Sequence, residues 1–195
     1  PVENYEKITN ERIVSHSFAK RSLYNGKPFT VGALARINLL GDRLEGIAKT
    51  YYDQYYGERW KKNIIFNIHA QMLEILYCLQ AVSPVVDDIM DADSGQEEVA
   101  KPTRTTGNGT GAVEAPRGTL YHHYELENGL IKRSNIVTPT AQNLDDIEET
   151  IRVAAKGLLG LKNTEDMKAK LEIVARAFDP CVSCSVHVLR PKTKR

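Results

Sequence analysis

Two of the three cysteines in the chain lie close together in the segment DPCVSCSVH, which runs from Asp179 to His187. Cys181 and Cys184 are three residues apart, and His187 follows three residues after Cys184. Two thiolates at this spacing can direct both sulfur atoms at one centre, and thiolates prefer soft metal ions. The segment predicts a soft metal that takes its remaining ligands from another part of the protein.

Other interpretations of these cysteines stay open on residue types alone. A thioredoxin-like dithiol opens a helix inside a β-α-β unit, whereas this pair follows a predicted helix. A zinc site could use Cys181, Cys184 and His187, but the fourth ligand of tetrahedral zinc has no candidate. Chance placement of two cysteines is the third alternative.

The elements that must position these residues are predicted to be mainly helical. Helices are expected near Ala33–Tyr52, from Trp60 onward with an end or kink at Pro84, from a cap at Asn143 to Gly160, and over Thr164–Phe178. The stretch Ser94–Ala112, rich in Gly and Thr, is expected to be a loop. Asn128-Gly129 between two strand-like runs predicts a β-hairpin. The expected fold is mainly α with a small β-hairpin (α+β), and His69 and Cys78 are expected to line its core.

Composition limits the function classes. With 42% hydrophobic residues, 26% charged residues and a net charge of +1, nothing favours nucleic acid or an anionic membrane as partner. No uninterrupted apolar run approaches the roughly 18 residues of a membrane span. Three cysteines do not form a secreted disulfide framework, so a reducing, cytoplasmic location is expected. The acidic residues from Asp87 to Asp93 lack the glycine-punctuated spacing of a calcium loop and indicate a solvated helix end.

Three segments together resemble one family. DPCVSCSVH resembles the motif DPCxxCxxH of nickel–iron hydrogenase large subunits, and EAPRGTLYHHYE (Glu114–Glu125) is similar to their motif EAPRGxLxH. SHSFAKRSLYNGKPFTVGALARINL is similar to the central segment of the cytosolic members. TPTAQNLDDIEE looks most like the NADP-linked bifunctional hydrogenases, or sulfhydrogenases. The resemblance covers essentially the whole chain and implies the C-terminal part of the large-subunit fold.

The resemblance implies a nickel–iron centre whose iron carries carbon monoxide and cyanide. Cys181 matches a terminal nickel ligand, and Cys184 matches the cysteine that bridges nickel and iron. Arg117 matches the arginine that lies over the centre, where a guanidinium suits the anionic cyanide nitrogen. The remaining matches are Pro116, which fixes the approach of the backbone, Thr140, which hydrogen-bonds a cyanide, and Asp179, which lies near the arginine.

A second metal site is implied as well. His187 matches the terminal histidine of a nearby Mg²⁺ (or Fe²⁺) site, to which the family contributes a main-chain carbonyl. By its spacing from Thr140, that carbonyl belongs to Ile136. His122 falls on the histidine of the RGxLxH pattern, where we expect a hydrogen bond rather than direct metal ligation.

The departures from the family pattern concern the other ligands. The family uses four cysteines at nickel, two of them from an RxCxxC motif that this chain does not contain. We therefore expect residues 1–195 to be the C-terminal half of a large subunit or one half of a split subunit, inactive alone. Residues 188–195 are expected to be an extension removed by a maturation endopeptidase.

The implied activity is reversible heterolytic cleavage of dihydrogen, with the terminal thiolate of Cys181 as proton acceptor. A guanidinium is a poor base near neutral pH, so Arg117 is expected to stabilise developing charge. The implied partners are the N-terminal half, an iron–sulfur small subunit, and diaphorase-type subunits that carry flavin and NAD(P). Two alternatives stay open: a hydrogenase-related subunit that has lost metal chemistry, and a small zinc-binding interaction module.

Overall fold

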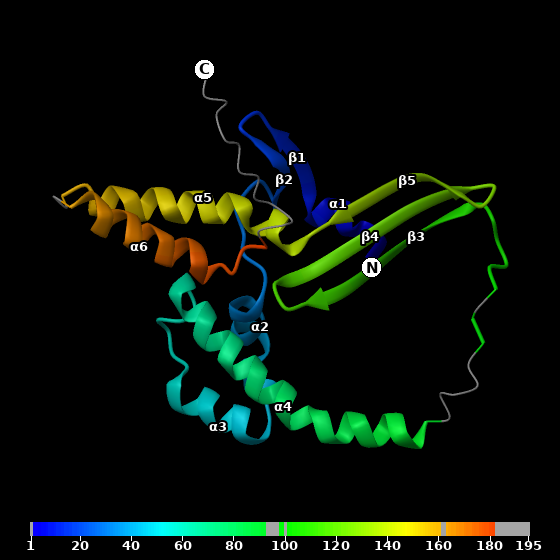
Figure 1. Cartoon of the computed structure of the whole chain (residues 1–195), viewed down its shortest axis with the longest axis horizontal. Coiled ribbons are helices and arrows are strands. Elements are labelled where there is room, and N and C mark those ends of the chain that lie inside the picture. Colours follow the sequence, from blue (N-terminus) through cyan, green and yellow to red (C-terminus); the bar gives the residue numbers. More distant parts are fainter. Residues whose placement is uncertain (1, 93–97, 100, 161–162, 182–195) are drawn as a thin grey trace, which may run out of the picture. The chain divides into compact units, whose positions relative to one another are not determined.

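The structure is a computed structural model that describes residues 2–92, 98–99, 101–160 and 163–181 of the 195-residue chain. Its helices are η1 (Val2–Asn4), α1 (Tyr5–Ile8), α2 (Ala33–Leu40), η2 (Gly41–Arg43), α3 (Gly46–Tyr55), η3 (Ile64–Phe66), α4 (Asn67–Asp91), α5 (Pro139–Leu158) and α6 (Thr164–Ala177) (Figure 1). The strands are β1 (Asn10–Val14), β2 (Ser17–Leu23), β3 (Gly107–Ala115), β4 (Gly118–Glu127) and β5 (Leu130–Val137). The predicted class, mainly α with a small β-hairpin (α+β), is confirmed, although the strands form two small sheets rather than one hairpin.

The chain divides into two compact units. The first comprises residues 1–32, 110–122 and 135–195, and the second comprises residues 33–109 and 123–134. In the first unit α5 lies beside α6, and the β1–β2 hairpin contacts α5 (Figure 1). The pairing of β1 with β2 is antiparallel, with an irregularity between Arg12 and Val14. This irregularity is typical of a β-bulge.

The second unit is built around α4. Its first half packs on α2 and α3, and the core consists of Ala33, Leu34, Ile37, Trp60, Ala70 and Leu73. Polar contacts fix this packing: the Asn67 side chain accepts from the N–H of Leu34 (3.0 Å), and Arg36 pairs with Glu74 (2.6 Å). The residues of α4 that make these contacts all lie on one face of the helix.

The predicted hairpin at Asn128-Gly129 is confirmed. These two residues join β4 to β5, and both have positive φ angles, +53° and +78°. Two left-handed residues in a two-residue loop are the geometry of a type I′ turn, which matches the twist of antiparallel strands. The sheet also contains β3, in the order β3-β4-β5, so the expectation that residues 94–112 form a loop is wrong from Gly107 onward. The β1–β2 hairpin was not predicted either.

Three helix predictions need correction. The helix expected over Ala33–Tyr52 is two helices, α2 and α3, separated at residues 41–45; the glycines at 41 and 46 lower helix propensity there. The helix expected from Trp60 onward begins at Asn67. Pro84 does not end it, because α4 continues to Asp91; the alternative, a kink at Pro84, stays a prediction. The helix expected to start at a cap on Asn143 begins at Pro139. The helix expected over Thr164–Phe178 is confirmed as α6, one residue shorter.

His69 and Cys78 are exposed in this chain rather than in the core. The ring of His69 lies against Trp60 and Phe66 at centroid distances of 5.6 and 5.4 Å. The segment Ile64–Asp91 is also long and apolar enough to cross a membrane by length and composition alone. The segment contains no uninterrupted apolar run of this length, because polar residues are interspersed along it, so the sequence pattern did not predict it. A single helix of this kind is a weak indication, since core helices of soluble proteins meet the same criterion.

Candidate metal centre

The start of α5 is set by Thr138 and Pro139. The Thr138 hydroxyl accepts a hydrogen bond from the N–H of Ala141 (3.3 Å), which satisfies one free amide of the first turn. Pro139 at the first helical position loses no hydrogen bond there. The helix thus starts four residues before Asn143, and Thr140, Gln142 and Asn143 become buried residues of its first turns.

The end of α6 is set by Asp179 and Pro180. Asp179 has a left-handed backbone (φ +49°), and its N–H donates to the carbonyl of Arg176 (2.9 Å). This is one of the two hydrogen bonds of a Schellman turn; Pro180 has no N–H to make the other. Asp tolerates the left-handed region better than most residues. The turn directs the chain out of α6 to Cys181.

Arg117 is held by Asp179. The arginine lies in the two-residue turn between β3 and β4. Its Nε donates to the main-chain oxygen of Asp179 (2.7 Å), and its Nη2 donates to the Oδ1 of the same residue (3.1 Å). Both side chains are partly exposed, 41% and 36%, so the ion pair adds little stability. Its effect is to fix the plane of the guanidinium.

Thr140 is tied to Cys181. The Thr140 hydroxyl is buried, with 2% of the residue exposed, and it accepts a hydrogen bond from the N–H of Cys181 (3.2 Å). A hydroxyl that accepts one hydrogen bond retains its own hydrogen as a donor. The structure therefore brings together four residues that the sequence singled out: Arg117, Thr140, Asp179 and Cys181.

The contacts made by two side-chain amides of α5 were not predicted from the sequence. Gln142 donates from Nε2 to the carbonyl of Thr119 on β4 (2.7 Å). The Asn143 side chain accepts from the N–H of Val31 (2.8 Å) and donates to its carbonyl (3.3 Å). A run of polar residues, TAQN, directly after a helix-initiating Pro was the available signal, because polar residues on the buried side of a helix need specific partners.

Gly32 and Gly118 allow two backbone segments to meet next to Arg117. A Cβ atom on Gly32 would lie 3.0 Å from the main-chain oxygen of Arg117. A Cβ on Gly118 would lie 2.3 Å from the Cγ2 of Val31. Both glycines also have positive φ angles, +116° and +130°. Since Asn143 binds Val31, α5 holds the segment against which the Arg117 turn packs.

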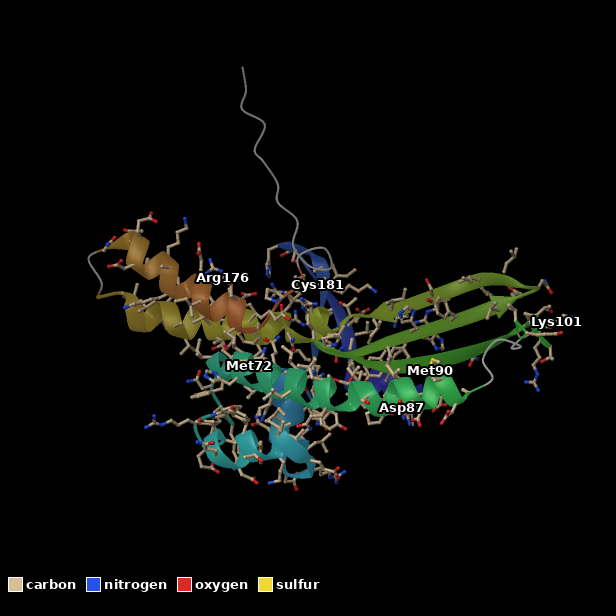
Figure 2. The ribbon with its side chains drawn as sticks, turned by 60° about the horizontal axis from the view of Figure 1, so that its bottom comes forward. Met72, Asp87, Met90, Lys101, Arg176 and Cys181 are labelled. Carbon is tan, nitrogen blue, oxygen red and sulfur yellow. The ribbon has the colours of Figure 1, made fainter. Side chains whose placement is uncertain are left out.

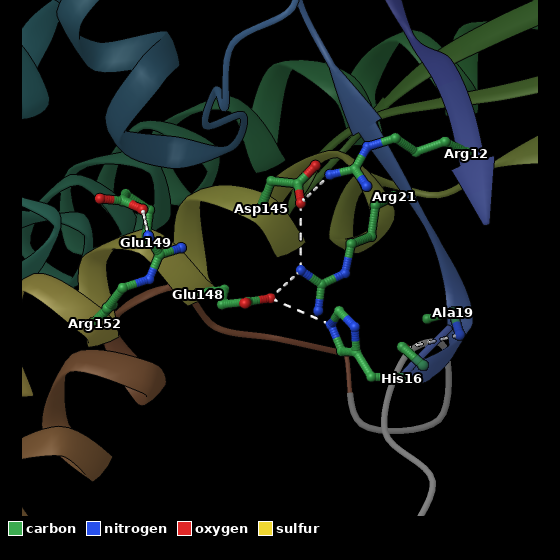
Figure 3. A network of polar contacts seen from close by, with 9 residues as sticks. Arg12, His16, Ala19, Arg21, Asp145, Glu148, Glu149 and Arg152 are labelled. Atoms are coloured by element: carbon green, nitrogen blue, oxygen red, sulfur yellow. Dashed lines mark hydrogen bonds and ion pairs between the residues drawn. The ribbon is translucent and has the colours of Figure 1, made fainter. Parts of the chain in front are cut away.

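An ionic network anchors α5 to the β1–β2 hairpin (Figure 3). Asp145 accepts from Arg12 (2.6 Å) and from the largely buried Arg21 (3.3 Å). Arg21 also binds Glu148, and the Nε2 of His16 lies 3.5 Å from Glu148 Oε2. The hydrogen bond from Arg21 lowers the pKa of Glu148 below its ordinary value of 4.5, against a smaller opposing effect of burial.

The remaining predicted site residues are Cys184, His187, Ile136, His122 and Pro116. Cys184 and His187 lie outside the described residues. Ile136 lies in β5 and is 44% exposed, and His122 lies half-buried in β4. Pro116 lies in the β3–β4 turn beside Arg117. Within the described residues, no three His, Cys, Asp or Glu side chains form a metal-binding group.

The comparison with known families gives a match over nearly the whole chain. Residues 2–187 match the family described as nickel-dependent hydrogenase. The chain belongs to the nickel-dependent hydrogenase family. The sulfhydrogenase 2 subunit alpha of Pyrococcus furiosus is 43% identical over 191 residues, which is 97% of this chain and 45% of that protein. The NAD-reducing hydrogenase HoxS subunit beta of Cupriavidus necator is 33% identical over 82% of this chain and 34% of that protein.

Solved structures agree with this hydrogenase assignment. A crystal structure of an NAD⁺-reducing [NiFe]-hydrogenase in the H₂-reduced state matches 94% of this chain and 42% of its own, with a TM-score of 0.79 and 28% identity. The reduced Ni-Fe-Se hydrogenase of Desulfovibrio vulgaris Hildenborough matches 90% of this chain and 39% of its own, with a TM-score of 0.69 and 25% identity. The chain spans under half the length of these relatives.

Proposed function

We propose that this chain supplies part of the nickel–iron site of a hydrogenase large subunit. One observation carries the proposal. Asp179 and Cys181 follow the same helix end, and each is tied to one residue from another part of the chain: Asp179 to Arg117, and Cys181 to Thr140. The start of α5, the end of α6 and the β3–β4 turn thus converge on the first cysteine of the DPCVSCSVH motif.

The residues present fit the group that the family name implies. Cys181 is disulfide-bonded in this structure; in its reduced form the thiolate would be a soft ligand that suits nickel, and we propose it as a terminal ligand, with Cys184 as the bridge to iron. Asp179 uses two of the five N–H groups of Arg117. The others, together with the Thr140 hydroxyl, would donate to the anionic nitrogen of cyanide on the iron. His187, with the Ile136 carbonyl, is proposed to hold Mg²⁺.

The bound metal pair would supply the heterolytic cleavage of dihydrogen. This chain's residues would provide the charge arrangement around it. Asp179 fixes the orientation of the Arg117 guanidinium, so that this cation would stabilise negative charge without rearranging. The Cys181 thiolate is the proposed proton acceptor, because a thiolate is a base, whereas a guanidinium is a poor one near neutral pH.

The activity of the whole protein needs residues beyond this chain. The chain has three cysteines, too few for a four-thiolate nickel site and an iron–sulfur relay. We propose that further cysteine ligands come from the N-terminal part of the large subunit. An iron–sulfur partner subunit would carry electrons to a flavin and NAD(P) subunit in the cytoplasm. The relatives named as sulfhydrogenase and NAD-reducing hydrogenase support this grouping.

The alternatives make different predictions about metal. A subunit that had lost metal chemistry would have no reason to retain a cysteine tied to a buried threonine beside an oriented arginine. A zinc module would bind zinc in the isolated chain at near-unit stoichiometry, whereas the proposed site is incomplete without the rest of the large subunit. Elemental analysis of the isolated chain after zinc dialysis separates these two cases.

Substitution of the cysteines in the assembled enzyme tests the proposal. Cys181→Ser and Cys184→Ser should abolish hydrogen turnover and reduce nickel to background, because serine oxygen is a hard ligand and does not bridge as sulfur does. Cys78→Ser, on the exposed face of α4, is the matched control and should retain activity and nickel. Normal turnover and nickel content in either site variant would refute the assignment.

Residues 188–195 are proposed to be removed during maturation, which would leave His187 as the last residue. The stretch is basic from Arg190 onward, and burial of those charges beside a metal site would be costly. Mass spectrometry of the active large subunit decides between the two forms. A terminus VLRPKTKR on fully active protein would contradict the proposal.

A further inference from the structure

The surface of α4 carries a continuous apolar stripe that no described residue covers. Its members follow one another at spacings of four, three, four, three, four and three residues, and each is 48–64% exposed. They are Ile68, Met72, Ile75, Leu79, Val82, Val86 and Ile89. We call this set the α4 stripe; Figure 2 shows Met72 near one end of α4, with Asp87 and Met90 near the other.

The opposite side of α4 is already used. Ala70 and Leu73 are buried in the core of the second unit. Glu74 pairs with Arg36 of α2, and Gln80 accepts a hydrogen bond from the N–H of Ala48 in α3 (3.0 Å). The helix therefore has two packing faces, and only one of them has its partner within the described residues.

The spacing of the α4 stripe specifies the kind of partner. Apolar residues that alternate at three and four along a helix form the seam by which two helices pack nearly parallel or antiparallel, with crossing angles near 20°. From Ile68 to Ile89 the stripe is roughly 30 Å long at 1.5 Å per residue. A partner that covers it is a helix of at least about 20 residues.

A groove beside the stripe fits the same partner. The groove lies between α3 and α4, has a volume of about 660 Å³, and is lined mainly by aromatic and aliphatic side chains. Tyr51 and Tyr55 line it from α3, and Trp60, His69, Met72 and Leu76 complete most of the wall. The apolar surface thus extends from the N-terminal half of the stripe toward α3.

The source of the partner follows from the lengths of the relatives. The matched region is 45% of the sulfhydrogenase 2 alpha subunit and 42% of the structurally similar NAD⁺-reducing hydrogenase chain, so more than half of each lies elsewhere. We propose that the α4 stripe is the contact surface for a long amphipathic helix from the part of the large subunit that lies outside this chain. The inference rests on family membership and the stripe alone, and it does not depend on the proposed metal roles.

A lipid bilayer fits the stripe less well. A helix that spans a bilayer is apolar on every side that meets lipid. Around the rest of α4 stand Asp87, Asp88 and Asp91, three exposed acids in its last two turns. Only a partner that contacts one face can bury the stripe and leave these carboxylates in water.

Photo-crosslinking in the assembled hydrogenase tests the proposal. A benzophenone amino acid at Leu79 should crosslink to a large-subunit peptide outside residues 1–195, and that peptide should show the same alternating apolar spacing. The control position is Asp88, on the other side of α4, which should give no such product. A crosslink from Leu79 to a second copy of this chain, to another subunit or to lipid would overturn the proposal.

Charge substitution gives a second readout. The double variant Leu79→Lys, Val86→Lys should lower the yield of assembled large subunit at least about tenfold, because two charges would enter a buried contact. The same variant should leave the thermal midpoint of the isolated 195-residue chain unchanged, since both side chains are exposed there. Asp88→Lys, Asp91→Lys is the matched control and should assemble normally. Normal assembly of the stripe variant would refute the inference.

Discussion

The side-chain amide of Asn143 forms hydrogen bonds with both the N–H and the carbonyl of Val31, 112 residues earlier in the chain. An amide that pairs with both backbone groups of one residue replaces the partner strand that this segment lacks. Val31 in turn contacts the Gly118 backbone, next to Arg117. Asn143 thus holds in place the segment on which the arginine turn rests.

We predict that Asn143→Ala destabilises the chain by about 1–3 kcal/mol, since it removes two hydrogen bonds and leaves two partly buried backbone groups of Val31 without this partner. Urea unfolding followed by circular dichroism measures the change. Glu149→Ala, which removes only a surface ion pair with Arg152, is the control and should cost at most about 0.5 kcal/mol. Equal effects for the two variants would show that the Asn143 contacts contribute nothing specific.

Gly118→Ala is predicted to destabilise the chain by more than about 2 kcal/mol. The new methyl group would collide with Val31, and the positive φ of the position would strain an alanine. Gly111→Ala, on the neighbouring strand β3, is the control, because its Cβ would meet nothing within 4 Å. The urea unfolding midpoints of the two variants measure the difference. Equal midpoints would show that Gly118 does not need to lack a side chain in order to lie against Val31.

Arg117→Lys in the assembled enzyme is predicted to leave assembly of the metal centre intact and to reduce hydrogen turnover. Lysine retains the charge, but its single nitrogen lacks the planar fork that binds the main-chain oxygen and the Oδ1 of Asp179. We expect the infrared bands of carbon monoxide and cyanide to persist. Hydrogen turnover should fall by several orders of magnitude, because the positive charge of lysine is no longer held in a fixed orientation. Turnover equal to that of the unmodified enzyme would show that Arg117 is only structural.

Glu148 is predicted to make stability depend on pH. Its pKa is lowered in the folded chain, chiefly by the hydrogen bond from Arg21. The stabilisation is therefore complete above the ordinary value of 4.5 and is lost as the pH falls through the lower folded pKa. Glu148→Gln should be less stable than the unmodified chain near neutral pH, and the difference should shrink under more acidic conditions. A difference that stays constant with pH would contradict this assignment.

Local sequence signals predicted the elements in which one residue type dominates the geometry. Asn128-Gly129 predicted its turn because both positions need positive φ, which these residues tolerate. The helix expected over Thr164–Phe178 ends one residue earlier, at Ala177. The resemblance to the hydrogenase motifs implied that Asp179 lies near Arg117, and two hydrogen bonds join these residues.

Elements that depend on distant partners were missed. Asn143 has the residue type of a helix cap, but the Thr138 hydroxyl takes that role, and Asn143 instead binds Val31. The strand character of Gly107–Ala112 comes from pairing with β4 rather than from its own composition. The apolar positions of α4 have the spacing of a core helix, yet their partner is not among the described residues.

The sequence distances across the candidate site have a consequence for folding. Thr140 and Cys181 are 41 residues apart, Arg117 and Asp179 are 62 apart, and Val31 and Asn143 are 112 apart. Helices form from local contacts, whereas contacts of this range require loop closure and form late. During translation Arg117 and Thr140 both emerge before the residues that they bind, so the first contact needs Asp179, and the second needs Cys181, to have left the ribosome. The cysteine thus joins a scaffold that is already synthesised, and its hydrogen bond to Thr140 is among the last contacts of the candidate site to form.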